Sequence, residues 1–267
     1  MMVRARCIVP LHNLISAMHR FFISKSEAVK TPLSLTGTEW HHCQTVLRCK
    51  IGNMITLFDG EGTEYLTSVE TMDRTGANLK LIRKTNSPRP SYSITLAQAL
   101  PKGKAMDYII QKATELGVNE IIPTFSERTV VKLEKDEIES KLTRWREISI
   151  EAAKQCGLNW LPVMNPPKTV KEVAALRRNF HLGFIGSLQP DSKPLWDYIA
   201  DPSSASKNIL MMIGPEGDFT PAEIGLAQGA GFLPLGLGPL VLRCDTAAIY
   251  AISTISYELR RLQKAKA

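Results

Sequence analysis

The first part of the chain, from Arg20 to about Lys84, alternates short apolar runs with turn residues. Apolar runs at residues 54–58, 65–69 and 78–82 are separated by turn formers such as Asp59 and Gly60. Runs of this length with turns between them are typical of strands, so the pattern predicts a small antiparallel β structure. Residues 86–90 contain two prolines, which cannot continue a β ladder, and predict a domain boundary.

Beyond Pro90 the pattern changes to strand-length apolar runs that alternate with helical periodicity. Strands are predicted at residues 94–100, 120–125, 181–185, 208–213 and 232–237. Apolar residues recur at helical spacing over 106–116 and 138–156, and these helices are expected to stop at Gly117 and Gly157. The alternation predicts an α/β domain with a mainly parallel sheet covered on both faces. In such sheets ligands bind in the loops at the carboxyl ends of the strands.

Length and composition set limits on this picture. A chain of 267 residues exceeds the usual single-domain size and favours two domains. Hydrophobic residues make up 44% and charged residues 22%, and no apolar run is long enough to span a membrane, which predicts a soluble protein without membrane partners. Five cysteines without a C-x-x-C pair argue against a disulfide framework and a zinc knuckle, and predict the reducing cytoplasm. His41 and His42 have no nearby partners, so no metal site is expected.

The net charge of +7 is concentrated near the N-terminus. Residues 1–90 carry 12 Lys and Arg against 7 Asp and Glu, whereas residues 91–267 carry 21 against 19. A basic lobe favours a polyanion such as nucleic acid, although a solvated surface is the alternative. The first 26 residues lack Asp and Glu, which is typical of transit peptides and basic arms. Residues 1–17, ahead of Met18, are interpreted as an extension without a fold of its own.

Two glycine-rich loops follow successive predicted strands. The first, residues 214–219, leads into Thr220-Pro221-Ala222-Glu223, which has the parts of a helix capping box. It matches neither the P-loop nor the dinucleotide motif, and this argues against a phosphate cradle. Taken alone, the loop fits either a ligand-binding loop or a tight turn without function. The second, residues 235–248, enters a helix that is predicted to run to about Gln263. Two such loops together predict a ligand site.

The sequences of these two loops resemble those of a known protein family. Residues 213–217, 237–239 and 242–247 resemble the paired C-terminal motifs of the SPOUT methyltransferases, and are most similar to the 16S rRNA uridine-N3 methyltransferases, the ribosomal small subunit methyltransferase E family. Further landmarks in the same order extend the resemblance along almost the whole chain from Arg20; they lie at residues 20–22, 41–42, 46–48, 58–60, 111–117 and 126–128.

The resemblance implies a fold, an activity and a cofactor. Residues 18–87 would form a PUA-like RNA-binding β-barrel, and residues 91–267 a SPOUT domain with a C-terminal trefoil knot. The activity would be methylation of a uridine N3 in 16S rRNA, or in the small ribosomal subunit, by a homodimer that binds S-adenosylmethionine. The implied cofactor-binding residues are Gly186, Ile213, Gly214, Pro215, Glu216, Gly217, Leu237, Gly238, Leu242, Arg243, Thr246 and Ala247.

This chain departs from the family pattern at three positions. Asp218 stands where the middle motif usually has Gly, Asp245 where the last motif usually has Glu, and Leu240 where an Arg is common. These departures keep two alternatives open, a non-catalytic rRNA-binding assembly protein and a SPOUT enzyme that acts on another RNA. A different α/β enzyme with a nucleotide in these loops is the third, and the lack of a phosphate motif counts against it.

Arg243 is the candidate catalytic residue. It would stabilise negative charge on the uracil oxygens when N3 loses its proton, and the alternative is that it pairs with Glu216 or Asp245. No general base stands out. Phosphate contacts are expected from basic residues in both domains, although each of them fits a solvated surface charge as well. These residues are Arg20, Arg48, Lys102, Lys104, Arg128 and Lys154.

Overall fold

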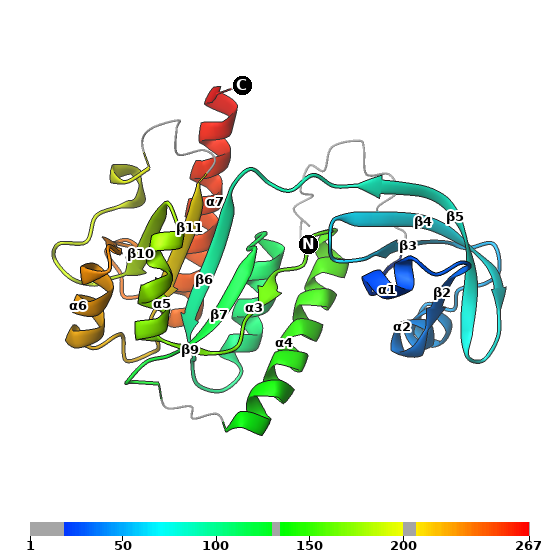
Figure 1. Cartoon of the computed structure of the whole chain (residues 1–267), viewed down its shortest axis with the longest axis horizontal. Coiled ribbons are helices and arrows are strands. Elements are labelled where there is room, and N and C mark those ends of the chain that lie inside the picture. Colours follow the sequence, from blue (N-terminus) through cyan, green and yellow to red (C-terminus); the bar gives the residue numbers. More distant parts are fainter. Residues whose placement is uncertain (1–18, 130–133, 200–206, 267) are drawn as a thin grey trace, which may run out of the picture. The chain divides into compact units, whose positions relative to one another are not determined.

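The computed structural model of the protein describes residues 19–129, 134–199 and 207–266 (Figure 1). The extension predicted for residues 1–17 lies outside the described residues. Contacts within the chain divide it between Ser87 and Pro88 into two units, each with its own core.

The first unit is a curled five-stranded sheet in the order β1-β3-β4-β5-β2. Its strands are β1 (Arg20–Phe22), β2 (Leu33–Thr36), β3 (Met54–Phe58), β4 (Thr63–Met72) and β5 (Gly76–Asn86). The predicted antiparallel pairing is confirmed for β2–β5, β3–β4 and β4–β5, but it is wrong for β1, which runs parallel to β3. Helices α1 (Lys25–Ala28) and α2 (Gly37–His41) and a π-helical turn (His42–Val46) lie between strands.

Curling of this sheet has a local cause. The register between β4 and β5 shifts twice, after Leu66 and after Val69. An extra residue in one strand bends it and increases its twist. The concave side encloses apolar side chains such as Phe21, Trp40 and Leu57, all at most 2% exposed.

The second unit contains a parallel sheet in the order β12-β10-β11-β6-β7-β8, and β9 also pairs with β7. Its strands are β6 (Ser93–Ala99), β7 (Glu120–Phe125), β8 (Val163–Met164), β9 (Lys168–Thr169), β10 (Leu182–Gly186), β11 (Asn208–Ile213) and β12 (Leu233–Leu235). The predicted mainly parallel sheet is thus confirmed. The two-residue strands β8 and β9 were not foreseen.

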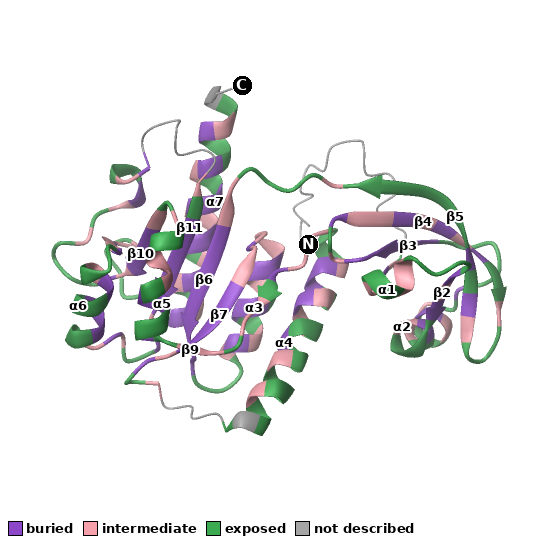
Figure 2. Ribbon diagram, in the orientation of Figure 1, coloured by how far each residue is buried: buried purple, intermediate pink, exposed green. Residues whose placement is uncertain are grey.

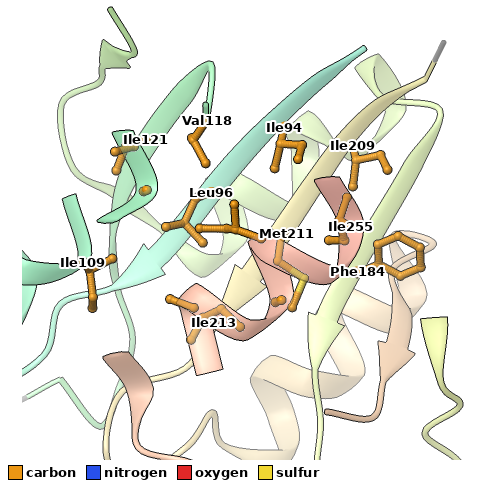
Figure 3. Packing of buried hydrophobic residues seen from close by; sticks show 14 of the residues in the cluster. Ile94, Leu96, Ile109, Val118, Ile121, Phe184, Ile209, Met211, Ile213 and Ile255 are labelled. Atoms are coloured by element: carbon orange, nitrogen blue, oxygen red, sulfur yellow. The ribbon is translucent and has the colours of Figure 1, made fainter. Parts of the chain in front are cut away.

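Helices cover both faces of this sheet, as predicted for a buried parallel sheet. They are α3 (Ala105–Glu115), α4 (Lys135–Cys156), α5 (Val170–Leu176), α6 (Pro221–Gly229) and α7 (Cys244–Lys266). Alternate residues of a strand reach opposite sides, so that Ile209 and Met211 pack with α3 and α7, while Leu210 and Met212 pack with α5 and α6 (Figures 1 and 3). Figure 2 shows the central strands almost entirely buried.

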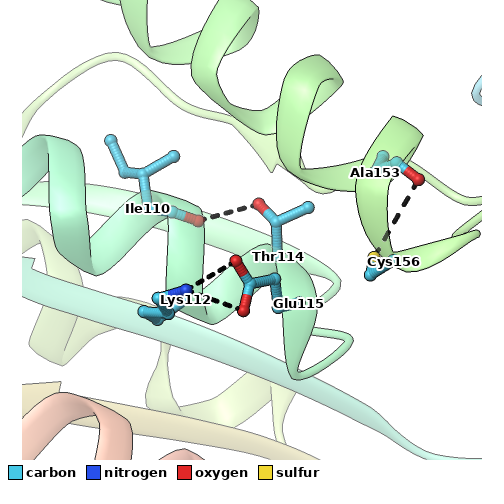
Figure 4. Close-up of polar contacts among 6 residues, drawn as sticks. All are labelled: Ile110, Lys112, Thr114, Glu115, Ala153 and Cys156. Atoms are coloured by element: carbon cyan, nitrogen blue, oxygen red, sulfur yellow. Dashed lines mark hydrogen bonds and ion pairs between the residues drawn. The ribbon is translucent and has the colours of Figure 1, made fainter. Parts of the chain in front are cut away.

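The C-terminal end of α3 shows why one sequence landmark of this chain is structural. The hydroxyl of Thr114, fully buried, donates to the carbonyl of Ile110 at 2.8 Å, and Lys112 donates to both carboxylate oxygens of Glu115 (Figure 4). Gly117 follows with φ of +79°, a left-handed conformation that costs glycine little. These contacts stabilise the C-terminal end of α3.

The path of the chain around β12 is unusual. On one side β12 pairs with β10, and on the other Leu235 bridges to Lys193, which belongs to the connection between β10 and β11. Backbone N–H groups of Lys193 and Gly236 donate to Pro234 and Lys193 across this second contact. The strand β12 is therefore flanked on both edges by the same β10-to-β11 stretch of chain, and α7 follows it.

Candidate functional site

Three strands of the second unit end at one cavity, which we call the loop cavity. It has a volume of about 290 Å³ and lies where β10, β11 and β12 reach their carboxyl ends, with the first turn of α7 as a further wall. This is the edge at which parallel sheets bind ligands. Its lining residues are Gly186, Ser187, Leu188, Ile213, Gly214, Pro215, Glu216, Asp218, Leu237, Gly238, Leu240, Val241, Leu242, Arg243, Cys244 and Ala247.

Most of the predicted cofactor-binding residues line this cavity. The exceptions are Gly217 and Thr246, which do not line it. Sequence reasoning missed Ser187, Leu188, Asp218, Leu240, Val241 and Cys244. Their positions in the sequence could have indicated them, because each lies within two residues of a predicted cofactor-binding residue.

The β11 loop (residues 214–220) has a defined backbone shape. The N–H of Asp218 donates to the carbonyl of Pro215 at 2.9 Å and closes a tight turn. Asp218 itself has φ of +59°, a left-handed conformation that Asp tolerates better than most residues because its side chain can bond locally. Here its carboxylate accepts from the N–H of Phe219 at 2.7 Å. The Gly usual at this position and the Asp found here therefore satisfy the same backbone requirement.

Two cavity glycines are closely surrounded, so that a Cβ there would meet its neighbours at short distances. A Cβ at Gly214 would lie 3.0 Å from the carboxylate of Asp218 and 3.3 Å from the backbone nitrogen of Phe219. A Cβ at Gly186 would lie 3.2 Å from the side chain of Ile213. Close packing thus holds β10 and the β11 loop against each other at the cavity wall.

Neighbouring loops hold the β11 loop in place. The backbone N–H of Lys102, in the β6 loop (residues 100–104), donates to the Glu216 carboxylate at 2.9 Å. The guanidinium of Arg128, which follows β7, donates to the carbonyl of Gly217 at 2.7 Å. The β11 loop is therefore braced by the loops that follow β6 and β7.

A buried carboxylate completes this bracing. Glu223, only 7% exposed, accepts from the backbone N–H and the hydroxyl of Thr220 at 2.9 and 3.2 Å in the predicted capping box of α6. Its other oxygen accepts from the N–H of Glu127 at 2.9 Å. One side chain thereby caps α6 and ties it to the loop after β7.

At the far wall, Arg243 directly precedes the helix α7. Its carbonyl accepts from the N–H of Ala247 at 2.8 Å, while its side chain is 84% exposed and lies 3.6 Å from the carboxylate of Asp245. Beside it, burial together with the carboxylates of Glu216 and Asp245 raises the pKa of the Cys244 thiol. That thiol is protonated at neutral pH and is a poor nucleophile.

The predicted RNA-binding residues differ in their surroundings. Arg20 is paired with Glu64 and stacks on Phe58, with its side chain 15% exposed. Lys154 is paired with Glu151, and its side chain is 9% exposed. Both side chains are thus largely engaged within the protein, and their role in RNA binding stays a prediction. By contrast Arg48, Lys102, Lys104 and Arg128 are exposed, although Arg128 also has the structural bond described above.

The chemistry of the loop cavity favours a particular kind of ligand. Its wall is largely apolar, with backbone groups of the β11 and β12 loops between the side chains, and it carries two carboxylates against one guanidinium. An apolar wall with a few polar groups suits a flat base, and an excess of carboxylate suits a cationic ligand rather than a phosphate. Within the described ranges, no cluster of His, Cys, Asp and Glu has the makings of a metal site.

Comparison with known proteins agrees with this geometry. The RNA methyltransferase domain family matches residues 87–256, and the RNA methyltransferase PUA domain family matches residues 35–82. The Ribosomal RNA small subunit methyltransferase E of Bacillus subtilis is 31% identical over 253 residues, which span 92% of this chain and 99% of the relative. The chain belongs to the ribosomal RNA small subunit methyltransferase E family.

Solved structures resemble this family member over nearly its whole length. A putative methyltransferase of Legionella pneumophila in complex with the bound cofactor SAM is 34% identical, with a TM-score of 0.81, covering 93% of this chain and 98% of that one. The Ribosomal RNA small subunit methyltransferase E of Neisseria gonorrhoeae bound to S-adenosyl methionine is 33% identical, with a TM-score of 0.79 and coverage of 89% and 96%. Among the residues that the structure describes, no helix is long and apolar enough to cross a membrane.

Proposed function

We propose that this protein methylates N3 of a uridine in the 16S rRNA of the small ribosomal subunit, with S-adenosylmethionine as methyl donor. The observation that carries the proposal is the loop cavity, in which glycine-lined loops after three successive parallel strands meet the first turn of α7. Family membership supplies the reaction, and the cavity supplies the place for it. The protein thus combines an RNA-binding unit with a methyl-transfer unit.

The loop cavity fits this cofactor. Glu216 and Asp218 give it a negative character suited to a sulfonium, and the apolar side chains of Leu237 and Leu242 suit an adenine ring. The residues proposed to hold the cofactor are the cavity-lining subset of the predicted ones: Gly186, Ile213, Gly214, Pro215, Glu216, Leu237, Gly238, Leu242, Arg243 and Ala247. The bound cofactor supplies an activated methyl group. The protein's task is then to align the acceptor nitrogen and exclude water.

Arg243 is proposed as the catalytic residue. The exposed guanidinium at the cavity wall is placed to meet a base that has left its helix, and its pair with Asp245 at 3.6 Å is too open to hold it fast. When N3 of uracil loses its proton, the charge spreads to the carbonyl oxygens. A guanidinium beside them stabilises that charge.

The RNA itself is proposed to contact both units. Residues 18–87 are proposed to form the PUA-like RNA-binding domain, with Arg48 exposed for a phosphate, and residues 91–267 the SPOUT domain. Lys102 and Lys104 lie in the β6 loop, next to the loop cavity through the bond from Lys102 to Glu216. Phosphate contacts there would fix the register of the RNA while the base enters the cavity.

We further propose that α7 is threaded into a trefoil knot. Support comes from β12, which contacts β10 on one edge and Lys193, in the β10-to-β11 connection, on the other, and which α7 follows in the chain. Stretching the chain by its ends tests this proposal. A knotted chain will stop short of full extension at about 3.6 Å per residue, whereas an unknotted chain will reach it.

A homodimer in the cytoplasm completes the proposal. Tyr250 and Tyr257 are 47% and 69% exposed and seven residues apart on α7, and Leu240 and Val241 just before α7 are 72% and 79% exposed. Apolar surface of this kind marks contact sites. Cys43, Cys49 and Cys244 are free thiols, as suits a reducing compartment. Sedimentation equilibrium will report a dimer for the wild type and a monomer for the Tyr257→Glu variant.

Nucleoside mapping of 16S rRNA tests the function directly. A strain that lacks the gene is expected to lose one 3-methyluridine, which purified protein and S-adenosylmethionine restore in vitro. Unchanged rRNA in that strain rules out the proposed reaction. Calorimetric titration with S-adenosylmethionine separates an enzyme from a non-catalytic assembly protein, since only the enzyme needs to bind it.

A further inference from the structure

A second cavity in the methyltransferase unit carries a charge opposite to that of the loop cavity. This basic cavity, about 250 Å³ in volume, lies between the β6 loop and the helices α3 and α4. Its polar side chains are Lys104, Lys141, Arg144 and Asp107, so three cations face one carboxylate. A hollow with this excess of positive charge attracts an anion.

The walls of the basic cavity hold their charged side chains in fixed positions. Lys141, Arg144 and Trp145 stand three and four residues apart on α4 and therefore share one face of the helix. Trp145, 3% exposed, packs into the core and gives the cavity a rigid wall. The positions of the two cations are thus set by a helix that is anchored from within.

Asp107 orients the guanidinium. Nε and Nη2 of Arg144 donate to the same oxygen of Asp107 at 3.2 and 2.6 Å. Since Arg144 is 56% exposed, such a pair adds little stability. Within the described residues Nη1 of Arg144 makes no hydrogen bond, which leaves donors for an anion in a geometry that suits phosphate oxygens.

The basic cavity adjoins the loop cavity through the chain. Lys104 lines the basic cavity, and Lys102, two residues earlier, donates its N–H to Glu216 in the wall of the loop cavity. An anion in the basic cavity would therefore lie on the other flank of the same short loop. Nucleic acid is the polyanion that an RNA methyltransferase brings to this face.

We propose that the basic cavity binds a backbone phosphate of the substrate RNA through Lys141 and Arg144, beside the nucleotide that enters the loop cavity. This inference rests on the proposed function and adds to it a subsite on α4. The contact is sequence-independent and positions the strand rather than selecting it.

The test compares Lys141→Ala with Arg146→Ala. Both residues are exposed on α4 and each substitution removes one positive charge, but Arg146 does not line the cavity. A 16S rRNA fragment serves as the probe, titrated at several salt concentrations. Lys141→Ala is expected to weaken binding roughly 3- to 10-fold and to make the slope of log K against log salt shallower by about 0.7 to 0.9. Arg146→Ala should change both much less.

Separate measurements distinguish the outcomes. Cofactor affinity, measured by calorimetry, should be the same in wild type and both variants. If Lys141→Ala and Arg144→Gln bind the RNA as Arg146→Ala does, the subsite is wrong even though the enzyme methylates. Loss of inorganic phosphate binding in Lys141→Ala without any loss of RNA binding also overturns it, in favour of a free anion. Wild-type protein that binds RNA but neither binds S-adenosylmethionine nor methylates contradicts the proposed function instead.

Discussion

Arg243 is the residue on which the proposed chemistry depends most directly. Replacing it with Ala removes the charge that stabilises the uracil oxygens, and the single-turnover rate constant should fall about 100-fold, as for other charge-stabilising donors. Cofactor affinity should fall much less than the rate constant, because the side chain is 84% exposed and the substitution keeps the backbone of Arg243 at the cavity wall. Arg243→Lys keeps the charge and should recover part of the rate. Full single-turnover methylation by Arg243→Ala with saturating RNA would show that Arg243 is not catalytic.

Asp218 tests the backbone requirement of the β11 loop. Because its φ is +59°, the Asp218→Val variant forces a β-branched residue into the left-handed region and should lower the free energy of unfolding by about 1–2 kcal/mol. Asp218→Gly removes that strain together with the bond to the Phe219 N–H, so its stability should stay near that of the wild type. Urea denaturation checks both. Equal losses for Gly and Val would mean that the side chain matters more than the backbone.

Cys43 makes the stability of the first unit depend on alkaline pH. Burial, and then the neighbouring Cys49, raise its pKa from 9.0 to about 12. Above pH 9 the unfolded chain therefore loses a proton that the folded chain keeps, so this contribution, present below pH 9, is lost as pH rises toward 12. Between pH 9 and 10 the wild type should lose about 1 kcal/mol more than Cys43→Ala. Parallel stability curves for the two proteins would contradict this.

At the scale of elements, the capping box of α6 allows a direct test of what one buried carboxylate contributes to stability. Glu223→Ala removes a buried carboxylate that accepts from Thr220 and Glu127, and should cost about 1–3 kcal/mol of stability. Glu172→Ala, which removes the same kind of cap from α5 at an exposed position, is the matched control and should cost less. Thermal unfolding of the wild type, Glu223→Ala and Glu172→Ala measures the two costs. Equal costs would mean that the tie to the loop after β7 contributes nothing.

Elements with a long apolar signal were predictable. Strands β7 and β11 have the bounds expected from their apolar runs, and α4 ends at Gly157 as the pattern indicated. The missed elements have no such signal: β8 and β9 span two residues each, too few for any periodicity. The parallel pairing of β1 with β3 arises from contacts between distant segments, which a local pattern does not contain.

The candidate site also contains residues that the sequence indicates and residues that it does not. The loops at residues 214–220 and 235–248 were predicted because glycine, proline and a capping box mark such loops in a sequence. Lys141 and Arg144 were not found, since they lie near the β6 loop only after α4 has packed on α3. The ion pairs of Arg20 with Glu64 and of Lys154 with Glu151 were not predictable for a related reason, because charge is visible in a sequence whereas such pairing is not.

At the scale of the whole molecule, the two units should be separable. Every buried residue of the core around Phe21 and Leu57 precedes Ser87, and every residue of the two cores around the parallel sheet follows Pro88. Residues 88–267 alone are therefore expected to fold and to bind S-adenosylmethionine with the affinity of the full chain. RNA affinity should fall, since the net positive charge is concentrated in residues 1–90.

Calorimetry and RNA titration on the isolated fragment measure both effects. A fragment that fails to fold, seen as a circular dichroism spectrum without a cooperative thermal transition, would contradict the separation. Unchanged RNA affinity would instead remove the first unit from RNA binding. The full chain, measured beside it, is the reference for both titrations.

The bond from the Lys102 N–H to Glu216 joins the loop that is proposed to meet RNA to the loop that is proposed to meet the cofactor. Any ligand that makes one arrangement of this bond more favourable changes the binding free energy of the other ligand, and thermodynamic linkage requires the effect to be reciprocal. If RNA tightens the binding of S-adenosylmethionine by some factor, the cofactor tightens the binding of RNA by the same factor. One peptide N–H would then make the two substrates of this protein cooperative, so that neither is held firmly until both are present.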